Sequence, residues 1–231
     1  MPRKKVISFS LFGRNPMYFS GAIENAKLAR QFYPEWVCRF YVSRDADMPS
    51  VLKLSNFPNV EISFCYGCSG FTSQWVRMEV AMDSTVKRFV VRDADSRLNA
   101  READAVMEWE KSDKPFHIMR DHKRHTAPIM GGMWGAVYGF IPPNEFEGLY
   151  RKAIDFVKSG KSKGKKYYKK NGVSDQGFLG NKIFPLIRTN HLAHDDKKRM
   201  TKDELKFSLK LPSGLFVGQQ YTRDNKPIKV K

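Results

Sequence analysis

The sequence predicts an α/β fold, in which a central sheet is flanked by helices. In the first half of the chain, short apolar runs rich in β-branched residues alternate with stretches of helical periodicity. The chain has 231 residues, of which 41% are hydrophobic, so one large domain can bury a substantial core. Its apolar runs are all shorter than the roughly 20 residues that a membrane-spanning helix needs.

The first half of the chain is expected to alternate between strand and helix from residue 6 onward. The alanines of the first helix share one face, Ser20 can cap this helix, and Pro34 follows its end. A later helix carries Trp75 and Met78 at helical spacing, which is typical of core packing. Strands are expected at 6–12, 36–42, 60–64 and 89–91, and helices at 20–32, 49–55 and from 72 or 73 onward.

The second half has clear helix signals but weaker strand signals. Asn99 with Glu102, and Asn144 with Glu147, have the spacing of capping boxes. His117 lies in an apolar run and is expected to be a buried, satisfied core histidine. Helices are expected at 99–111, 144–159 and 174–183, strands at 116–119 and 186–189, a loop at 122–135 and a polar end at 191–195. Because no repeat or linker interrupts the chain, a single domain covering residues 1–231 is predicted.

Two carboxylates follow directly after the predicted strand at 89–91. Asp93 and Asp95 are one residue apart, and side chains at positions i and i+2 of an extended chain point to the same side. They are therefore expected to face one point beyond the carboxyl end of the strand, where open α/β sheets bind ligands. Two hard oxygen donors suit Mg²⁺ or Mn²⁺ carried by a diphosphate. The alternative is a solvated turn that caps the next helix; an EF-hand is excluded because Leu98 stands where that loop needs glycine.

The net charge of +17 points to an anionic partner, and nucleic acid, acidic lipid and a phosphate-bearing substrate all qualify. Much of the charge lies in the lysine-rich segment Lys158–Lys170, which is expected to be a mobile loop, either a lid over an anionic donor or only solvated. Cys65 and Cys68 form a C-x-x-C pair without a second ligand pair. A reduced loop pair and a cytoplasmic location are therefore expected.

Several sequence blocks resemble, in their order, the nucleotide-sugar glycosyltransferases of the GT-A type. The blocks lie at 92–99, 117–122, 130–135 and 174–179, followed by His194 and Asp195. Within that family they are most similar to the group that includes the glycosyltransferase domain of a chlorovirus protein building capsid glycans. The resemblance extends over roughly residues 6–218. It implies a viral enzyme acting in the host cytoplasm.

The resemblance implies a GT-A-like domain with a Rossmann-like mixed sheet. Its nucleotide-binding half would cover about 1–98 and its acceptor-binding half about 99–218, with a tail at 219–231. The implied metal ligands, for Mn²⁺ or Mg²⁺, are Asp93, Asp95 and His194, with Asp195 as an alternative to the histidine. The implied donor-binding residues are Ser10, Leu11, Phe12, Gly13, Tyr18, Arg77, Arg92, Asp93, Ala94 and Asp95. The implied acceptor or sugar contacts are Gly131, Gly132, Trp134 and Gln176.

The implied reaction transfers a sugar from a nucleotide diphosphate sugar, most often UDP-linked, to a hydroxyl of a glycan or glycoprotein. Asp175 is the first candidate for the catalytic carboxylate and Asp121 the second, in either an inverting or a retaining route. Asp175 with Ser174 is equally compatible with a helix cap.

Two other functions remain open at this stage. A nucleic-acid-binding protein or metal-dependent nuclease would explain the charge, with Glu79 or Asp83 as weak additional ligands. Attachment of the lysine-rich segment to an acidic membrane surface is the other hypothesis, and it is compatible with the first function. Under the glycosyltransferase hypothesis, nucleic acid is not an obligatory partner, and the sequence leaves the oligomeric state open.

Overall fold

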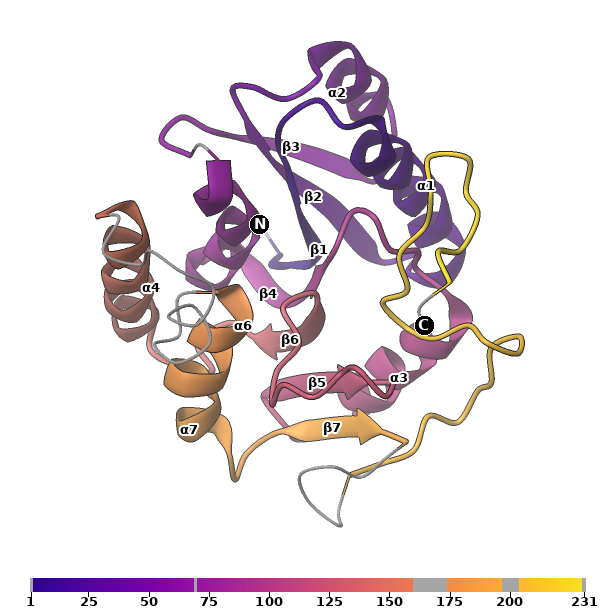
Figure 1. Cartoon of the computed structure of the whole chain (residues 1–231). Helices are drawn as coiled ribbons and strands as arrows, with labels where there is room; N and C mark the ends of the chain where they lie inside the picture. The colour runs from indigo at the N-terminus through magenta and orange to yellow at the C-terminus, as the bar shows by residue number, and fades with distance from the viewer. Residues whose placement is uncertain (1, 69, 160–173, 197–203, 230–231) are drawn as a thin grey trace.

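The computed structural model describes residues 2–68, 70–159, 174–196 and 204–229, and every structural statement below refers to these residues. A seven-stranded sheet forms the centre of the molecule, in the order β3-β2-β1-β4-β6-β5-β7 (Figure 1). This confirms the predicted α/β class with a mixed sheet. The strands are β1 (Lys4–Leu11), β2 (Trp36–Ser43), β3 (Val60–Cys65), β4 (Val86–Arg92), β5 (Phe116–Arg120), β6 (Met133–Val137) and β7 (Leu192–Asp195).

The direction of the strands brings several segments to one edge of the sheet. β1 pairs in parallel with both β2 and β4, so the carboxyl ends of these strands lie at the same edge. β6 is antiparallel to β4, with Met133 opposite Arg92. The segment that enters β6 therefore starts where β4 ends. This topology places residues 10–13, 93–95 and 130–132 together although they are far apart in the sequence.

Helices cover both faces of the sheet (Figure 1). On one face, α1 and α3 pack through Ala22, Ala26 and Trp109 against apolar residues of β1, β2 and β4. On the other face, Trp75 and Phe178 belong to a cluster that includes β4, β5 and β6. The helices are α1 (Pro16–Phe32), α2 (Met48–Ser55), η1 (Gly70–Met82), α3 (Ala100–Lys111), α4 (Pro143–Lys158), α6 (Asp175–Phe178), η2 (Leu179–Ile183) and α7 (Phe184–Ile187).

Two strands of the second half differ from the prediction. β6 lies within the segment expected to be a loop, because glycines, which weaken strand propensity, obscure it in the sequence. One of them, Gly135, is needed there: a Cβ atom added to it would lie 2.6 Å from Phe89 O. The last strand is β7 and not residues 186–189, of which 186–187 lie in α7. β7 was not predicted because it contains the polar residues His194 and Asp195, which are not typical of a buried strand.

Helix starts also differ, whereas the capping signal of α3 is confirmed. α1 begins at Pro16, and Asn15 is its cap, because proline is favoured in the first helical turn. α4 begins at Pro143 without a side-chain cap, so the predicted box at Asn144 lies inside the helix. Asn99 caps α3 by accepting a hydrogen bond from Glu102 N at 3.1 Å.

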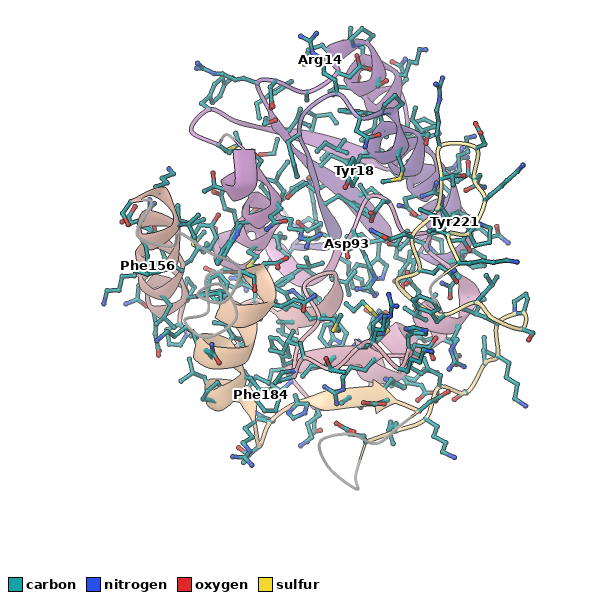
Figure 2. The ribbon with its side chains drawn as sticks, in the orientation of Figure 1. Arg14, Tyr18, Asp93, Phe156, Phe184 and Tyr221 are labelled. Atoms are coloured by element: carbon teal, nitrogen blue, oxygen red, sulfur yellow. A yellow bond between two sulfur atoms is a disulfide. The ribbon has the colours of Figure 1, made fainter. Side chains whose placement is uncertain are left out.

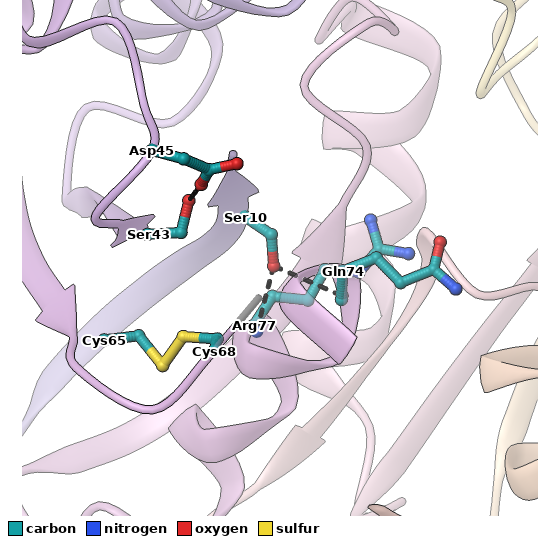
Figure 3. Close-up of a disulfide and its surroundings, with 7 residues drawn as sticks. All are labelled: Ser10, Ser43, Asp45, Cys65, Cys68, Gln74 and Arg77. Atoms are coloured by element: carbon teal, nitrogen blue, oxygen red, sulfur yellow. Dashed lines mark hydrogen bonds between the residues drawn. A yellow bond between two sulfur atoms is a disulfide. The ribbon is translucent and has the colours of Figure 1, made fainter. Parts of the chain in front are cut away.

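The C-x-x-C pair is oxidised in the structure. A disulfide joins Cys65 and Cys68 near the start of η1 (Figure 3), so the expected reduced pair is wrong. The cytoplasmic location stays a prediction, without support from this pair. The lysine-rich segment lies outside the described residues except for its first two. Among the described helices, none combines the length and the apolar character needed to cross a membrane.

Candidate active site

A polar cavity of about 230 Å³ lies at the sheet edge where β1 and β4 end. Asp93 and Asp95 line it together with Tyr18, as the sequence predicts for a shared ligand site. Figure 2 shows Asp93 near the middle of the molecule with Tyr18 close to it. The complete lining consists of Ser10, Phe12, Tyr18, Gln74, Arg77, Asp93, Ala94, Asp95 and Gln220.

Arg77 joins the first carboxylate of the motif to the predicted catalytic carboxylate. Its guanidinium donates through Nη1 to Asp93 Oδ1 and through Nη2 to Asp175 Oδ2, the latter at 3.0 Å. Burial would lower the pKa of Arg77, but the charges of Asp93 and Asp175 outweigh burial and raise this pKa. A planar guanidinium can serve both carboxylates at once because its donors form a fork. Two residues 82 positions apart are thus held at one point.

The helix η1 holds Arg77 in place through two serines of β1. Ser10 Oγ donates to Gln74 O at 3.2 Å and accepts from Arg77 N at 3.1 Å (Figure 3). Ser8 Oγ donates to Arg77 O at 2.7 Å. Small polar residues in an otherwise apolar strand therefore fix the position of the arginine. Ser10 contributes to the site through this anchoring as well as by lining the cavity.

Gly131 and Gly132 lie directly against the two carboxylates. A Cβ atom at Gly132 would overlap the carboxylate of Asp93, and one at Gly131 would lie 2.5 Å from Asp175 Oδ2. No L side chain fits there without moving the carboxylates. At both positions glycine lets the backbone approach a carboxylate closely. Gln176 is exposed beside Asp175 and donates its main-chain N–H to Asp175 Oδ1 at 2.8 Å.

Asp175 does not cap the helix α6, which was the alternative role that the sequence allowed. Ser174 is the cap of α6, because its hydroxyl accepts a hydrogen bond from Gly177 N at 3.0 Å. The Asp175 side chain is instead turned toward Arg77 and is 14% exposed. The cap and the candidate catalytic group are therefore two adjacent residues.

The electrostatics of the cavity favour a cation beside the motif. Burial, followed by the charge of Asp93, raises the pKa of Asp95 to about 6. Burial and the same two aspartates also raise the pKa of Tyr18. Both shifts reflect negative charge concentrated in a space with little water, where a divalent ion would relieve the repulsion. The two carboxylates fit the binding of Mg²⁺ or Mn²⁺ through one or two protein oxygens together with substrate phosphates.

His194 is not brought to this pair, which corrects the predicted third metal ligand. It lies on β7, and β6 and β5 separate that strand from β4, which corresponds to roughly 14 Å at the usual strand spacing. Asp195, the alternative, lies on the same strand, and its Oδ2 accepts a hydrogen bond from Arg120 Nε at 2.7 Å in the core. Among the described residues, no group of three or more His, Cys, Asp or Glu side chains could hold a metal ion.

His194 instead belongs to a buried hydrogen-bonded row. Its Nδ1 lies 2.9 Å from His117 Nε2, and its Nε2 lies 3.1 Å from Glu108 Oε2. An ionised carboxylate only accepts, so His194 carries its proton on Nε2 and His117 donates to Nδ1. The prediction of a buried core histidine at 117 is confirmed, since its exposure is 0%, but it is satisfied only at Nε2, because its Nδ1 has no hydrogen-bond partner among the described residues.

Four further predicted site residues lie outside the cavity. Asp121 is held by Arg101 in two hydrogen bonds of 3.0 and 2.6 Å and does not line the cavity. Arg92 is fully buried beside Glu102 in the sheet, and its side chain does not reach the cavity. Leu11 and Trp134 are core residues with exposures of 1% and 0%. Arg92 and Leu11 are each next to a cavity-lining residue in the sequence, but they are buried and do not line the cavity themselves.

Of the remaining predicted donor residues, Phe12, Tyr18 and Ala94 line the cavity, whereas Gly13 does not. Phe12 stacks with Tyr18 at a centroid distance of 6.3 Å, and both line the cavity. Gly13 follows with a φ of 66°, a value that favours glycine. Ala94 lines the cavity between the two aspartates.

Two cavity residues were missed in the sequence. Gln74 lies one helical turn before Arg77, a signal that could have indicated it. Gln220 is in the segment predicted to be a tail, and no local pattern marks it. The weak nuclease ligands do not join the site: Asp83 pairs with Arg39 at 2.5 Å, and Glu79 lines a different cavity.

Comparison with solved structures identifies the fold. The galactosyltransferase LgtC, solved in complex with donor and acceptor sugar analogues, aligns with a TM-score of 0.51 and 9% identity over 84% of this chain and 74% of its own. The fold is that of a GT-A glycosyltransferase. The expected GT-A resemblance is thus confirmed at the level of the fold.

Two further glycosyltransferases align with the GT-A fold of this chain. GlyE of Streptococcus pneumoniae TIGR4 aligns with a TM-score of 0.50 and 12% identity over 85% of this chain, which spans about half of GlyE (46%). A glycosyltransferase involved in glycosylation of the major capsid of PBCV-1 aligns with a TM-score of 0.48 and 11% identity, over 84% of this chain and 82% of its own. No protein-family model and no curated protein matches the sequence.

Proposed function

We propose that this protein is a metal-dependent glycosyltransferase that moves a sugar from a nucleotide diphosphate sugar to a hydroxyl group. The observation that carries the proposal is the Asp93–Arg77–Asp175 cluster packed against Gly131 and Gly132. Asp93 would hold the cation, Arg77 would bind phosphate, and Asp175, joined to Arg77, would supply the carboxylate base. A UDP-linked donor and a glycan or glycoprotein acceptor are the corresponding substrates.

The donor diphosphate would bind between Arg77 and the Asp93–Asp95 pair. Mn²⁺ or Mg²⁺ held by these two carboxylates would stabilise the charge that develops on the leaving diphosphate. Arg77 would add a positive charge beside it that is already in place, because Ser8 and Ser10 hold its backbone and Asp93 and Asp175 hold its guanidinium. Phe12 and Tyr18, at the mouth of the cavity, are positioned to contact the base and ribose.

Asp175 is the proposed catalytic carboxylate. In an inverting route it would accept the proton of the acceptor hydroxyl, and in a retaining route it would face the reacting carbon. The backbone at Gly131 and Gly132 leaves room for the sugar beside it. We also propose a cytoplasmic location. Contact of the lysine-rich segment with an acidic membrane is compatible with this function.

A thermal-shift and calorimetric titration with UDP, GDP and CDP, each with and without Mn²⁺, tests the function. A ligand that binds only the folded state raises the unfolding midpoint. We expect Mn²⁺-dependent stabilisation by one nucleoside diphosphate in the wild-type protein. Asp93→Ala and Asp95→Ala should lose it without losing the fold, because both residues lie in a turn beyond the strand.

The exposed carboxylate Asp113 provides the matched control. Asp113→Ala should bind the same nucleotide with wild-type affinity. Equal Mn²⁺-dependent binding in Asp93→Ala and Asp113→Ala would contradict the assignment of the site. A DNA oligomer added to the same panel tests the nucleic-acid alternative, which predicts stabilisation by DNA in place of the nucleotide.

A further inference from the structure

The C-terminal part of the described chain forms a hairpin beside the cavity. Thr222 N donates to Lys226 O at 2.8 Å, and Ile228 N donates to Gln220 O at 2.9 Å. Asn225 lies at the tip with a φ of 59°, which asparagine tolerates better than most residues. The segment 219–229 is therefore ordered by its own main-chain hydrogen bonds, and we refer to it as the C-terminal hairpin.

The C-terminal hairpin is attached to the turn that carries the two aspartates. Tyr221 N donates to Asp95 O at 2.9 Å, and Gln220 forms an antiparallel bridge with Ser96. Arg97 donates through Nε to Asn225 Oδ1 at 2.6 Å, and its guanidinium lies 5.1 Å from the centre of the Tyr221 ring. These contacts hold the hairpin without help from the Gln220 side chain. Figure 2 shows Tyr221 on the chain segment that runs past the side of the molecule.

The Gln220 side chain is directed into the cavity and not into the hairpin. Its Nε2 donates to Asp95 Oδ2 at 2.7 Å, and the residue is part of the cavity lining. Asp95 is 5% exposed, whereas Gln220 is an exposed residue, so the bond joins a buried carboxylate to an amide at the surface. This hydrogen bond engages Oδ2 of Asp95 but not Oδ1.

We propose that Gln220 is a positioning residue that orients Asp95 so that a single oxygen is presented to a divalent cation. The torsion that rotates a carboxylate is broad, so an isolated Asp95 would sample many orientations. The amide of Gln220 fixes one of them and disfavours bidentate binding. Groups that orient metal ligands in this way affect metal affinity strongly. This inference rests on the proposed function, because it assumes that Asp93 and Asp95 bind the cation.

The test measures Mn²⁺ binding by the whole chain, with MnCl₂ alone as the probe and the free-ion EPR signal as the readout. Gln220→Met keeps the length and volume of the side chain but removes the donor. Lys226→Met introduces the same residue at an exposed position of the same hairpin and is the matched control. We expect Gln220→Met to weaken Mn²⁺ affinity by about tenfold, whereas Lys226→Met stays at the wild-type value.

Amide hydrogen exchange at Tyr221 separates positioning from a structural role. We expect wild-type protection in Gln220→Met, because Tyr221 N keeps its bond to Asp95 O. If affinity falls only together with this protection, the effect is structural and the positioning role is wrong. If Gln220→Met binds Mn²⁺ like Lys226→Met while Asp93→Asn binds it weakly, the inference is overturned and the metal site stands. If Asp93→Asn has no effect, the metal site itself is wrong, and the inference falls with it.

Discussion

Gly132 shows how a residue without a side chain can determine the position of a carboxylate in the candidate site. We predict that Gly132→Ala displaces the Asp93 carboxylate, because the added Cβ atom would occupy its place. Mn²⁺-dependent nucleotide binding, measured by calorimetry, should fall by at least about tenfold, as expected when a ligand loses its geometry.

Gly148→Ala is the control for this substitution. Gly148 lies in α4, and a Cβ atom there meets nothing within 4 Å. Alanine in a helix is favoured over glycine by about 1 kcal/mol, so this variant should be slightly more stable and bind like wild type. Unchanged binding in Gly132→Ala would show that Asp93 does not need its present position.

Single residues also show why neighbours in the sequence were wrongly assigned to the site. Arg92 and Asp93 are adjacent, but Arg92 is the last residue of β4 and is buried beside Glu102, whereas Asp93 is 42% exposed beyond the strand. Side chains of an extended chain alternate between faces. A motif therefore locates a site to within a few residues, and the strand end decides which of them face the ligand.

At the scale of elements, the His117–His194–Glu108 row connects β5, β7 and α3. Burial lowers the pKa of both histidines, and for His117 the pKa lies well below the ordinary value of 6.5. Below pH 6.5 the unfolded chain binds protons that the folded chain does not. These two residues therefore contribute full stability above pH 6.5, and the contribution is lost as the pH falls below it.

Urea unfolding between pH 5 and 7.5 measures this effect. We expect the free energy of unfolding of the wild type to fall faster with acidification than that of His117→Phe, by up to about 1.4 kcal/mol per pH unit. Other groups titrate in both proteins and cancel in the difference. Parallel pH profiles would mean that His117 takes up a proton in the folded protein.

The helices and strands that were predicted correctly are those whose own residues carry the signal, such as a cap or an apolar run. Asn99 caps α3 as predicted, and the apolar runs at 36–42 and 60–64 form β2 and β3. β6 and β7 were not recognised because their stability depends on distant partners: Gly135 packs under Trp109, and Asp195 pairs with Arg120. Neither partner can be inferred from the strand sequence itself.

At the scale of the whole molecule, an acidic site lies on a strongly basic protein. Asp93, Asp95 and Arg77 line the cavity, and Arg77 also pairs with Asp175, while the chain carries a net charge of +17. The long-range field should attract an anionic nucleotide, and the local charge should admit it only with a cation.

The rate of nucleotide association tests this arrangement of charge. With Mn²⁺ present, the association rate of the nucleotide should fall as NaCl is raised from 0.05 to 0.5 M, over which range the Debye length shrinks from about 14 to 4 Å. Stopped-flow fluorescence of the tryptophans measures it. An association rate independent of salt would mean that the basic charge plays no part in donor capture.

The antiparallel pairing of β4 and β6 has a consequence for altering the proposed site by evolution or design. Arg92 and Met133 are paired in the ladder, so the spacing between Asp93 and the glycines before β6 is fixed by main-chain hydrogen bonds. Substitutions cannot widen that gap gradually, because a register shift moves every side chain to the other face. New sugar or base preferences should therefore arise in the loop after β1 and in the C-terminal hairpin, which border the same cavity but are not tied to that ladder.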